Sequence, residues 1–228
     1  MDGESNTSSS LTPLDSTLTD AVLCHPYYSC HLGSVHGRFR VSERYATIVA
    51  DPPWVQPSGG PRSGSGFAVA SGRPSTLPYS TLHVNDIIGL PVSDLAARDA
   101  HLYLWVTNAH IEDAYRIARA WGFKPSTLLT WAKTPHGIGL GGTFVQTTEH
   151  VLFCRRGTLA ASARIDSTWW NWKRGVHSAK PESFLDLVES VSPGPYLEMF
   201  ARRNRLGWDT WGNESLAHVE IAPAGERC

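Results

Sequence analysis

Short apolar runs separated by polar turns organise the chain from residue 45 onward. The runs at 45–50, 101–107, 126–133, 147–157 and 196–202 are rich in β-branched, aromatic and leucine residues, and each predicts a strand. Apolar positions at intervals of three or four predict helices between them. This alternation is typical of an α/β fold with a mostly parallel sheet, which binds ligands beyond the carboxyl ends of its strands.

Two helices have a clear apolar face. The first ends at Gly122 and the second begins at Pro181, in keeping with the preference of glycine for helix ends and of proline for helix starts. Their apolar faces consist of Ile111, Ala114, Tyr115, Ala118 and Trp121 in the first helix, and of Phe184, Leu185, Val188 and Val191 in the second.

Changes in composition set the expected domain limits. The chain opens on a stretch rich in Ser, Thr and Asp, and we expect a disordered tail over 1–37. A single domain is expected over 38–216, with a flexible C-terminus at 217–228. Within the domain, residues 55–77 are dense in Gly, Ser and Pro and predict a mobile loop.

The overall composition is that of a globular protein, with 41% hydrophobic and 18% charged residues. No apolar stretch approaches the roughly 18 residues of a membrane helix, and the first twenty residues carry no Lys or Arg to begin a secretory signal. Four cysteines are too few and too unevenly spaced for a disulfide framework, so we expect reduced thiols. These features predict a cytoplasmic protein that does not act at a membrane.

The net charge of −1 hides an uneven distribution. Residues 1–37 carry four acidic residues and no Lys or Arg, and 206–228 carry four acidic residues against one Arg. The middle of the chain, 38–205, has 19 Lys and Arg against 13 Asp and Glu, a net +6. This mild excess permits a phosphate-backbone partner without requiring one.

A cluster of possible metal ligands lies near the N-terminus. Because five residues separate its two cysteines, the cluster matches no usual zinc spacing, and we interpret it as part of a flexible lead-in and expect no metal site. Its members are Cys24, His25, Cys30, His31 and His36.

The first predicted strand ends at Asp51-Pro52-Pro53-Trp54, a position where an α/β fold binds its ligand. The prolines lack N–H donors, so the segment offers a carboxylate and carbonyls as acceptors, with the Trp54 ring as a flat apolar surface. A purine with an exocyclic amino group needs this combination. A proline-rich turn with a core tryptophan explains the four residues equally well.

Eight short motifs follow one another along the chain: Asp51–Trp54, Pro78–Leu82, Leu104–Thr107, Trp131–Lys133, Glu149–His150, His177–Pro181, Leu197–Arg202 and Trp211–Glu214. Their order resembles the N6-adenine methyltransferase family, which includes the catalytic subunit of the eukaryotic mRNA methylase and bacterial and phage members. The resemblance covers roughly 45–215 and rests on eight ordered signals rather than one tetrapeptide.

The resemblance implies a Rossmann-like, S-adenosylmethionine-dependent methyltransferase fold in which the Asp-Pro-Pro-Trp strand precedes the cofactor strand. It implies that Asp51 and the Pro52 carbonyl accept hydrogen bonds from the adenine N6 amino group. Holding both N–H groups in a bent geometry localises the nitrogen lone pair for in-line attack on the methyl group. The residues it implies for catalysis are Asp51, Pro52, Pro53 and Trp54.

The same resemblance implies which residues hold the base and the cofactor. Tyr79, Trp54 and Lys133 would lie against the base. Lys180 is a cation suited to the methionine carboxylate or to a phosphate, and polar ends on an apolar strand suit a ribose. The implied cofactor set is Asp51, Lys180, Glu198, Phe200, Arg202, Asn213 and Glu214.

Several features depart from the family pattern or stay open. No Gly-x-Gly turn follows Leu197–Phe200, and the loop after Trp54 is long. We expect Trp105 and Trp131 to be packing residues and His150 to be a satisfied core histidine. The aromatic and basic segment 169–174 fits base stacking and packing over the sheet about equally.

We expect the substrate to be DNA, because the compact build resembles stand-alone bacterial or phage members. An RNA substrate is the first alternative, and a catalytically silent member that binds nucleic acid or a partner protein is the second. A homodimer or a partner subunit is expected, since a small positive surface provides little base readout.

Overall fold

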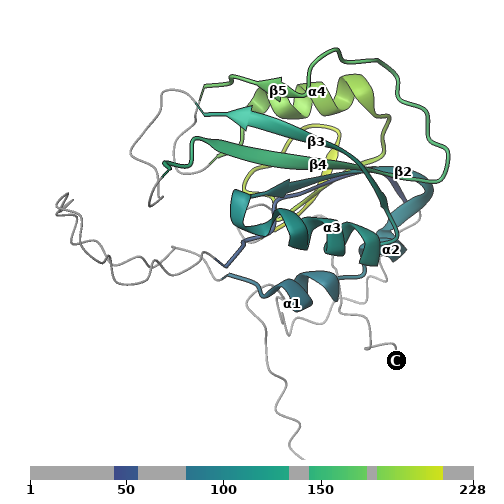
Figure 1. Ribbon diagram of the computed structural model, residues 1–228. Helices are drawn as coiled ribbons and strands as arrows, with labels where there is room; N and C mark the ends of the chain where they lie inside the picture. The colour runs from purple at the N-terminus through teal and green to yellow at the C-terminus, as the bar shows by residue number, and fades with distance from the viewer. Residues whose placement is uncertain (1–43, 56–80, 134–143, 174–178, 213–228) are drawn as a thin grey trace, which may run out of the picture.

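The computed structural model describes residues 44–55, 81–133, 144–173 and 179–212, which together form one seven-stranded sheet with helices on both faces (Figure 1). The strand order is β5-β3-β4-β2-β1-β6-β7. Several predictions lie outside the described residues: the tail, the loop 55–77 except Val55, the C-terminus, the Cys/His cluster, Tyr79, Asn213 and Glu214.

All strands but one point the same way. Strand β4 runs antiparallel to its neighbours β2 and β3, while the other four pairings are parallel, so the expected mostly parallel sheet is confirmed. The strands are β1 (Tyr45–Ala50), β2 (Ala96–Val106), β3 (Lys124–Ala132), β4 (Thr148–Arg156), β5 (Trp169–Trp170), β6 (Tyr196–Met199) and β7 (Trp208–Trp211).

The helices divide between the two faces of the sheet (Figure 1). One face carries α1 (Val84–Ile88), α2 (Val92–Leu95), the 3₁₀ turn η1 (Asn108–His110) and α3 (Ile111–Ala120), and the other carries α4 (Glu182–Val191). Both predicted helices are confirmed, and their apolar residues pack into two separate buried clusters, one on each face. None of the helices described is long and apolar enough to cross a membrane.

The main differences from the prediction concern two element limits and the order of strands and helices. Strand β2 begins at Ala96, five residues before the expected start. The strand expected over 196–202 ends at Met199, because Phe200 adopts φ 64°, a left-handed conformation that leaves the ladder. Strands and helices do not alternate throughout, since β6 and β7 are joined by Phe200–Gly207 without a helix.

The reversed direction of β4 matters for the site. The parallel strands β1, β2, β3 and β6 end at one edge of the sheet, and β4 starts at that edge because it is antiparallel. The residues after β1 and β3 and the first residues of β4 therefore lie together. We call this the carboxyl edge.

Candidate active site at the carboxyl edge of the sheet

Asp51 follows β1, which lies between β2 and β6 near the middle of the sheet. Its N–H donates to the Met199 carbonyl at 3.3 Å, so the residue is tied to the neighbouring strand. The buried Pro52 and Pro53 turn the chain, and their carbonyls accept from Trp54 N–H at 2.9 Å and Leu82 N–H at 3.0 Å. The turn is thus held by backbone bonds at each end, and Asp51 projects from a fixed position.

Trp54 is buried, with 4% of its surface exposed. Its indole N–H donates to the Trp105 carbonyl at 3.1 Å, and its ring stacks on His110 with a centroid separation of 5.0 Å and an interplanar angle of 17°. One face of the indole is therefore covered by protein. In this arrangement Trp54 anchors the turn that follows β1, and its contact with a base stays a prediction.

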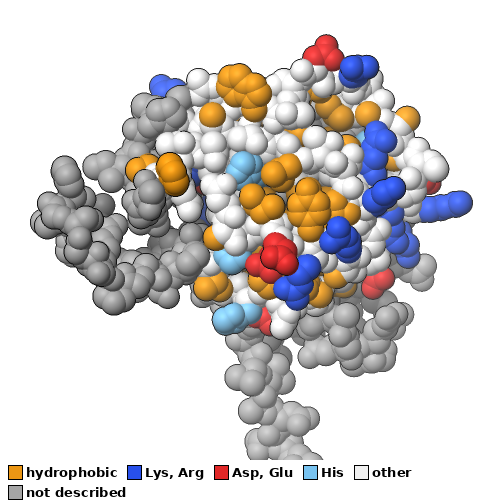
Figure 2. All heavy atoms as spheres, viewed as in Figure 1, with side chains coloured by type: hydrophobic (Ala, Val, Ile, Leu, Met, Phe, Trp, Pro, Cys, Tyr) orange, Lys and Arg blue, Asp and Glu red, His pale blue; other side chains and the backbone are white. Residues whose placement is uncertain are grey.

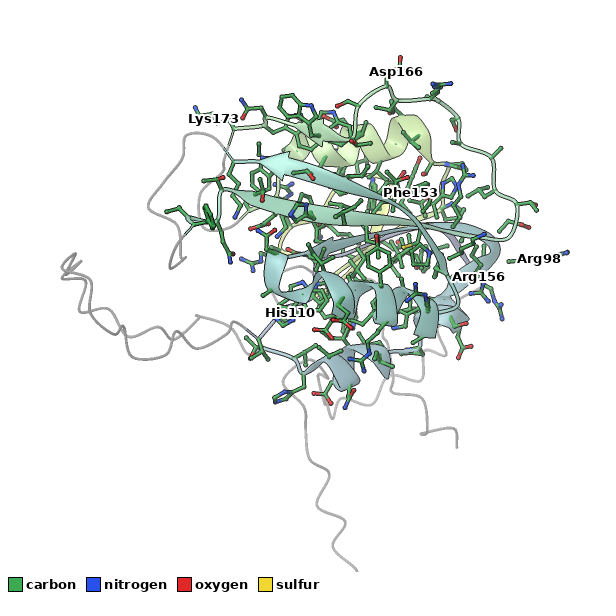
Figure 3. The ribbon with its side chains drawn as sticks, in the orientation of Figure 1. Arg98, His110, Phe153, Arg156, Asp166 and Lys173 are labelled. Carbon is green, nitrogen blue, oxygen red and sulfur yellow. The ribbon has the colours of Figure 1, made fainter. Side chains whose placement is uncertain are left out.

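His110, which is labelled in Figure 3, was assigned no role from the sequence, yet it contacts both Trp54 and Val55 in the turn after β1. Besides stacking on Trp54, its Nε2 lies 2.6 Å from the Val55 carbonyl, and its Nδ1 lies 3.0 Å from Asp113 Oδ2. A carbonyl and a carboxylate only accept, so both bonds form only when both ring nitrogens carry a proton. Neither its spacing nor its neighbours in the sequence mark this histidine.

Lys180 joins two carboxylates at the carboxyl edge. Its Nζ lies 2.9 Å from Asp51 Oδ2 and 3.1 Å from Glu149 Oε2, and it sits 4.9 Å from the centroid of the Trp105 ring. Burial by itself lowers the pKa of Lys180, but the charges of Asp51 and Glu149 outweigh this and raise it above its usual value. The ammonium ion therefore stays charged and fixes the Asp51 carboxylate.

Glu149 extends this chain of charges to Lys133, whose Nζ lies 2.6 Å from Glu149 Oε1. Burial acts to raise the pKa of Glu149, but the two lysines prevail and lower it. The sequence assigned Glu149 no specific role, because only the antiparallel course of β4 brings its first residues to this edge. The two lysines and two carboxylates balance, so the cluster as a whole is neutral.

Glu198 is the unusual carboxylate of the site. It lies on β6 beside Val49 of β1, and its Oε2 is buried with no hydrogen-bond partner among the described residues. Burial raises the pKa of Glu198 to about 7, with Arg203 acting against the rise and Asp51 adding to it. A buried acceptor without a donor is costly in a folded protein. Such an oxygen suits a ligand that brings hydroxyl donors.

The segment after β6 carries two further predicted cofactor residues. Phe200 is buried at 8% exposure and packs edge-on against Trp211, with centroids 5.0 Å apart. Arg202 is half-buried and lies three residues beyond the end of β6, rather than on the strand as expected. A Cβ at Gly212 would lie 2.3 Å from the Ala201 carbonyl oxygen, so this close approach requires glycine.

Three further residues, two tryptophans and a histidine, were interpreted from the sequence as structural. Trp105 and Trp131 are buried packing residues, as expected, at 1% and 4% exposure. His150 is satisfied by Thr130 Oγ1 at 3.1 Å and Asn108 Oδ1 at 2.8 Å, although it is half-buried rather than in the core.

Packing accounts for part of the Trp-rich segment. Trp172 lies against Phe184 of α4 and stacks with Trp170 at 5.2 Å between ring centroids. Trp169, by contrast, is 61% exposed beside the end of β3, so the base-stacking interpretation stays open for this one side chain. No group of three or more His, Cys, Asp or Glu suited to a metal occurs in the part of the chain that the structure describes.

Comparison with known proteins agrees with this geometry. The family model described as MT-A70 matches residues 45–214. The chain is 29% identical over 199 residues to the Type II methyltransferase M.MunI of a Mycoplasma species, covering 81% of this chain and 84% of that protein.

Two eukaryotic relatives are similar over shorter parts of their length. Identity to the N6-methyladenosine RNA methyltransferase MTA1 of Cryphonectria parasitica is 29% over 181 residues, covering 74% of this chain and 51% of that protein. Identity to the N(6)-adenine-specific methyltransferase METTL4 of Homo sapiens is 29% over 215 residues, covering 80% and 40%. The chain therefore spans most of the bacterial relative and about half or less of these two.

Proposed function

Because the chain belongs to the MT-A70 family, we propose that it is an S-adenosylmethionine-dependent methyltransferase that acts on the N6 amino group of adenine in nucleic acid, with DNA as the polymer. The observation that carries the proposal is the Asp51 carboxylate, held at the end of β1 by Lys180 at 2.9 Å and flanked on the next strand by Glu198, whose Oε2 has no partner among the described residues.

The chemistry of the donor set fits the cofactor. When bound, S-adenosylmethionine supplies an electrophilic methyl group on a sulfonium centre. Glu198 would accept from the ribose hydroxyls, since its buried Oε2 has no partner among the described side chains. Lys180 would face the methionine carboxylate, and Phe200 and Arg202 would flank the nucleoside. Lys180 already binds Asp51 and Glu149. We therefore expect it to keep both of these partners when it also binds the methionine carboxylate of the cofactor.

The substrate amino group would be held by acceptors. Asp51 would accept one N–H, and the Pro52 carbonyl, which uses one lone pair for Trp54 N–H, keeps a second for the other N–H. Both prolines lack an N–H, so no donor competes for the amino nitrogen. Lys180 would keep Asp51 in place during the approach of the base. Lys133 is linked to Lys180 through Glu149, which pairs with both lysines.

The proposed polymer is DNA because the chain and the bacterial type II methyltransferase match over most of both lengths. RNA is the second candidate, favoured by the similarity to the fungal RNA methyltransferase. A silent family member is disfavoured because Asp51, Lys180 and Glu149 are joined by ion pairs in one site.

The test is transfer of labelled methyl from S-adenosylmethionine to single- and double-stranded DNA and RNA, followed by nucleoside mass analysis. We expect N6-methyladenine in DNA, and a loss of about 10²–10³-fold or more in kcat for Asp51→Asn, a change comparable to removing one preorganised hydrogen-bond partner. Asp166→Asn changes an exposed carboxylate paired with Arg164 and should leave the rate unchanged.

Two results would contradict the proposal. N6-methyladenosine found in RNA and not in DNA would show that RNA is the substrate. No transfer to any of the four substrates, with cofactor binding also absent, would support the silent member. Circular dichroism of Asp51→Asn separates lost chemistry from lost folding, since the substitution leaves Lys180 with one carboxylate.

A further inference from the structure

Six cationic side chains gather at the amino edge of the sheet, opposite the site. Figure 2 shows basic side chains along this flank, and Figure 3 shows that Arg98 and Arg156 lie on it. They come from the start of β1, from β2, from the last turn of α3, and from the facing ends of β3 and β4. We call Arg44, Arg98, Arg119, Lys124, Arg155 and Arg156 the basic edge.

The cations of the basic edge differ from most other described cations because they form no salt bridges with described carboxylates. Elsewhere in the described ranges, most cations bind a carboxylate: these are Arg116, Arg164, Arg203, Arg205, Lys133 and Lys180. None of the six basic-edge residues forms a salt bridge within those ranges. Arg156 instead donates to the Ser93 carbonyl at 2.8 Å, and the guanidinium groups of Arg119, Arg155 and Arg156 lie over aromatic rings.

Two of these cations are placed against each other. Lys124 on β3 is directly opposite Arg155 on the antiparallel strand β4, and both are exposed. Like charges in this position destabilise a sheet. Asp99, a nearby acid, accepts from the Thr158 N–H and hydroxyl, and the Thr158 N–H bond is the main cause of its lowered pKa, to which the charge of Arg98 also contributes. Asp99 therefore offsets part of the charge beside Arg98, while Lys124 and Arg155 form no salt bridge with any described residue, and a bound polyanion would stabilise that facing pair.

We infer that the basic edge binds the phosphate backbone of the nucleic acid at a distance from the base that reacts. This inference rests on the proposed function and adds a second contact to it. Exposed Arg and Lys side chains are the usual partners of backbone phosphates, and such contacts position a nucleic acid without reading its sequence.

The geometry sets a minimum length for the substrate. Lys124 and Lys133 stand at opposite ends of β3, nine residues apart, which is about 30 Å at the rise of a strand. A duplex rises about 3.4 Å per base pair, so a straight duplex needs about nine pairs beyond the target base to reach the basic edge. Shorter substrates should contact the active site alone.

The test compares two double variants with the same change in net charge. Lys124→Ala/Arg155→Ala removes the facing pair, and Arg116→Ala/Arg164→Ala removes two cations that are paired with carboxylates. Fluorescence anisotropy measures binding to a 40-base-pair duplex and to a hairpin with an eight-base-pair stem, in DNA and in RNA, across a salt series.

We expect the facing-pair variant to bind the 40-base-pair duplex about tenfold more weakly, with a salt dependence shallower by about 1.8 in log–log slope, as for two lost phosphate contacts. The hairpin should bind and be methylated as by the unsubstituted protein. Thermal melting should stay the same or rise, because a like-charge pair is removed.

Equal binding of the long duplex by the two double variants would overturn the inference, and so would an equal loss on hairpin and duplex, since the contact would then lie near the reacting base. Poly-L-glutamate that binds through the facing pair while the nucleic acids do not would also overturn it, in favour of an acidic protein partner. Anisotropy needs no methyl transfer, so failure of the proposed activity remains distinguishable from failure of the basic edge.

Discussion

At the residue scale, Glu198 is the side chain whose state depends most on the ligand. Burial raises its pKa to about 7, and its Oε2 has no hydrogen-bond partner among the described residues. Ribose hydroxyls that donate to Glu198 would stabilise its ionised form. Below a pH of about 7 most Glu198 side chains carry a proton, which must leave before the ribose binds in this way. The affinity for S-adenosylmethionine should therefore fall as the pH is lowered from 8 to 6, approaching tenfold per unit below about 7.

Calorimetric titration at pH 6, 7 and 8 measures this dependence, and Glu198→Gln should flatten it. In the free protein the effect on stability has the opposite sign. The folded-state pKa exceeds that of an unfolded glutamate, so Glu198 makes the free energy of unfolding decrease as the pH rises from about 4.5 to about 7. An unchanged affinity slope in Glu198→Gln would show that another group titrates.

Residue types and their order named three side chains that the structure places near one another. Asp51, Lys180 and Glu198 lie on adjacent parts of the carboxyl edge, and the roles that the resemblance implies for them stay predictions. Glu149 and His110 received no role, because Glu149 pairs with lysines 16 and 31 residues away and His110 binds a carbonyl 55 residues away. Lone acidic and histidine residues carry no periodic or spacing signal that would mark them.

At the scale of elements, the start of α3 supports the segment that follows β1. His110 stacks on Trp54 and binds the Val55 carbonyl, while Asp113 in the first turn of α3 orients its ring. His110→Ala should cost about 1–3 kcal/mol of stability, since it leaves the Val55 carbonyl and Asp113 with one partner fewer. It should also lower kcat, because the Asp51 turn loses its support, with little change in the KM for S-adenosylmethionine.

Thermal melting and steady-state kinetics check this expectation. His110→Phe keeps a flat ring against Trp54 without the two hydrogen bonds, so its kcat should lie between those of His110→Ala and the unsubstituted protein. His83→Ala changes an exposed histidine before α1 and serves as the matched control. A kcat for His110→Ala equal to that of the control would show that His110 does not support the Asp51 turn during catalysis.

The elements themselves were predicted unevenly. Long periodic segments such as α3, α4 and β4 were found close to their true limits. The helices α1 and α2, with five and four residues, are shorter than the pattern needed to recognise a helix. The last strand, β7, has only four residues, and its pairing with β6 rather than its composition makes it a strand.

At the scale of the whole molecule, one sheet separates two buried clusters, and both faces depend on it. Cys154 of β4 lies fully buried in that sheet, and burial raises the pKa of its thiol to about 12. A thiol in this state reacts only when the structure opens. With Cys24, Cys30 and Cys228 changed to Ser, labelling by a disulfide reagent should therefore report opening of the core.

The expected result is slow labelling of the native protein and immediate labelling in denaturant. S-Adenosylmethionine at 100 times its Kd should slow native labelling by about 100-fold if global unfolding exposes the thiol, because ligand binding stabilises the folded state by that factor. Rapid labelling of the native protein would show instead that β4 opens locally.

The sequence by itself determined the fold class, the approximate limits of α3, α4 and β4 and the residue types of the candidate site, because periodic burial and the Asp-Pro-Pro-Trp turn are local properties of the chain. Tertiary structure alone decided the direction of β4, which carries Glu149 to Lys180, and the burial of Glu198 Oε2 without a partner among the described residues. It also decided that Lys124 and Arg155 form a cross-strand pair. These features depend on which strands become neighbours, and neighbours are chosen by packing across the whole sheet rather than by any one segment.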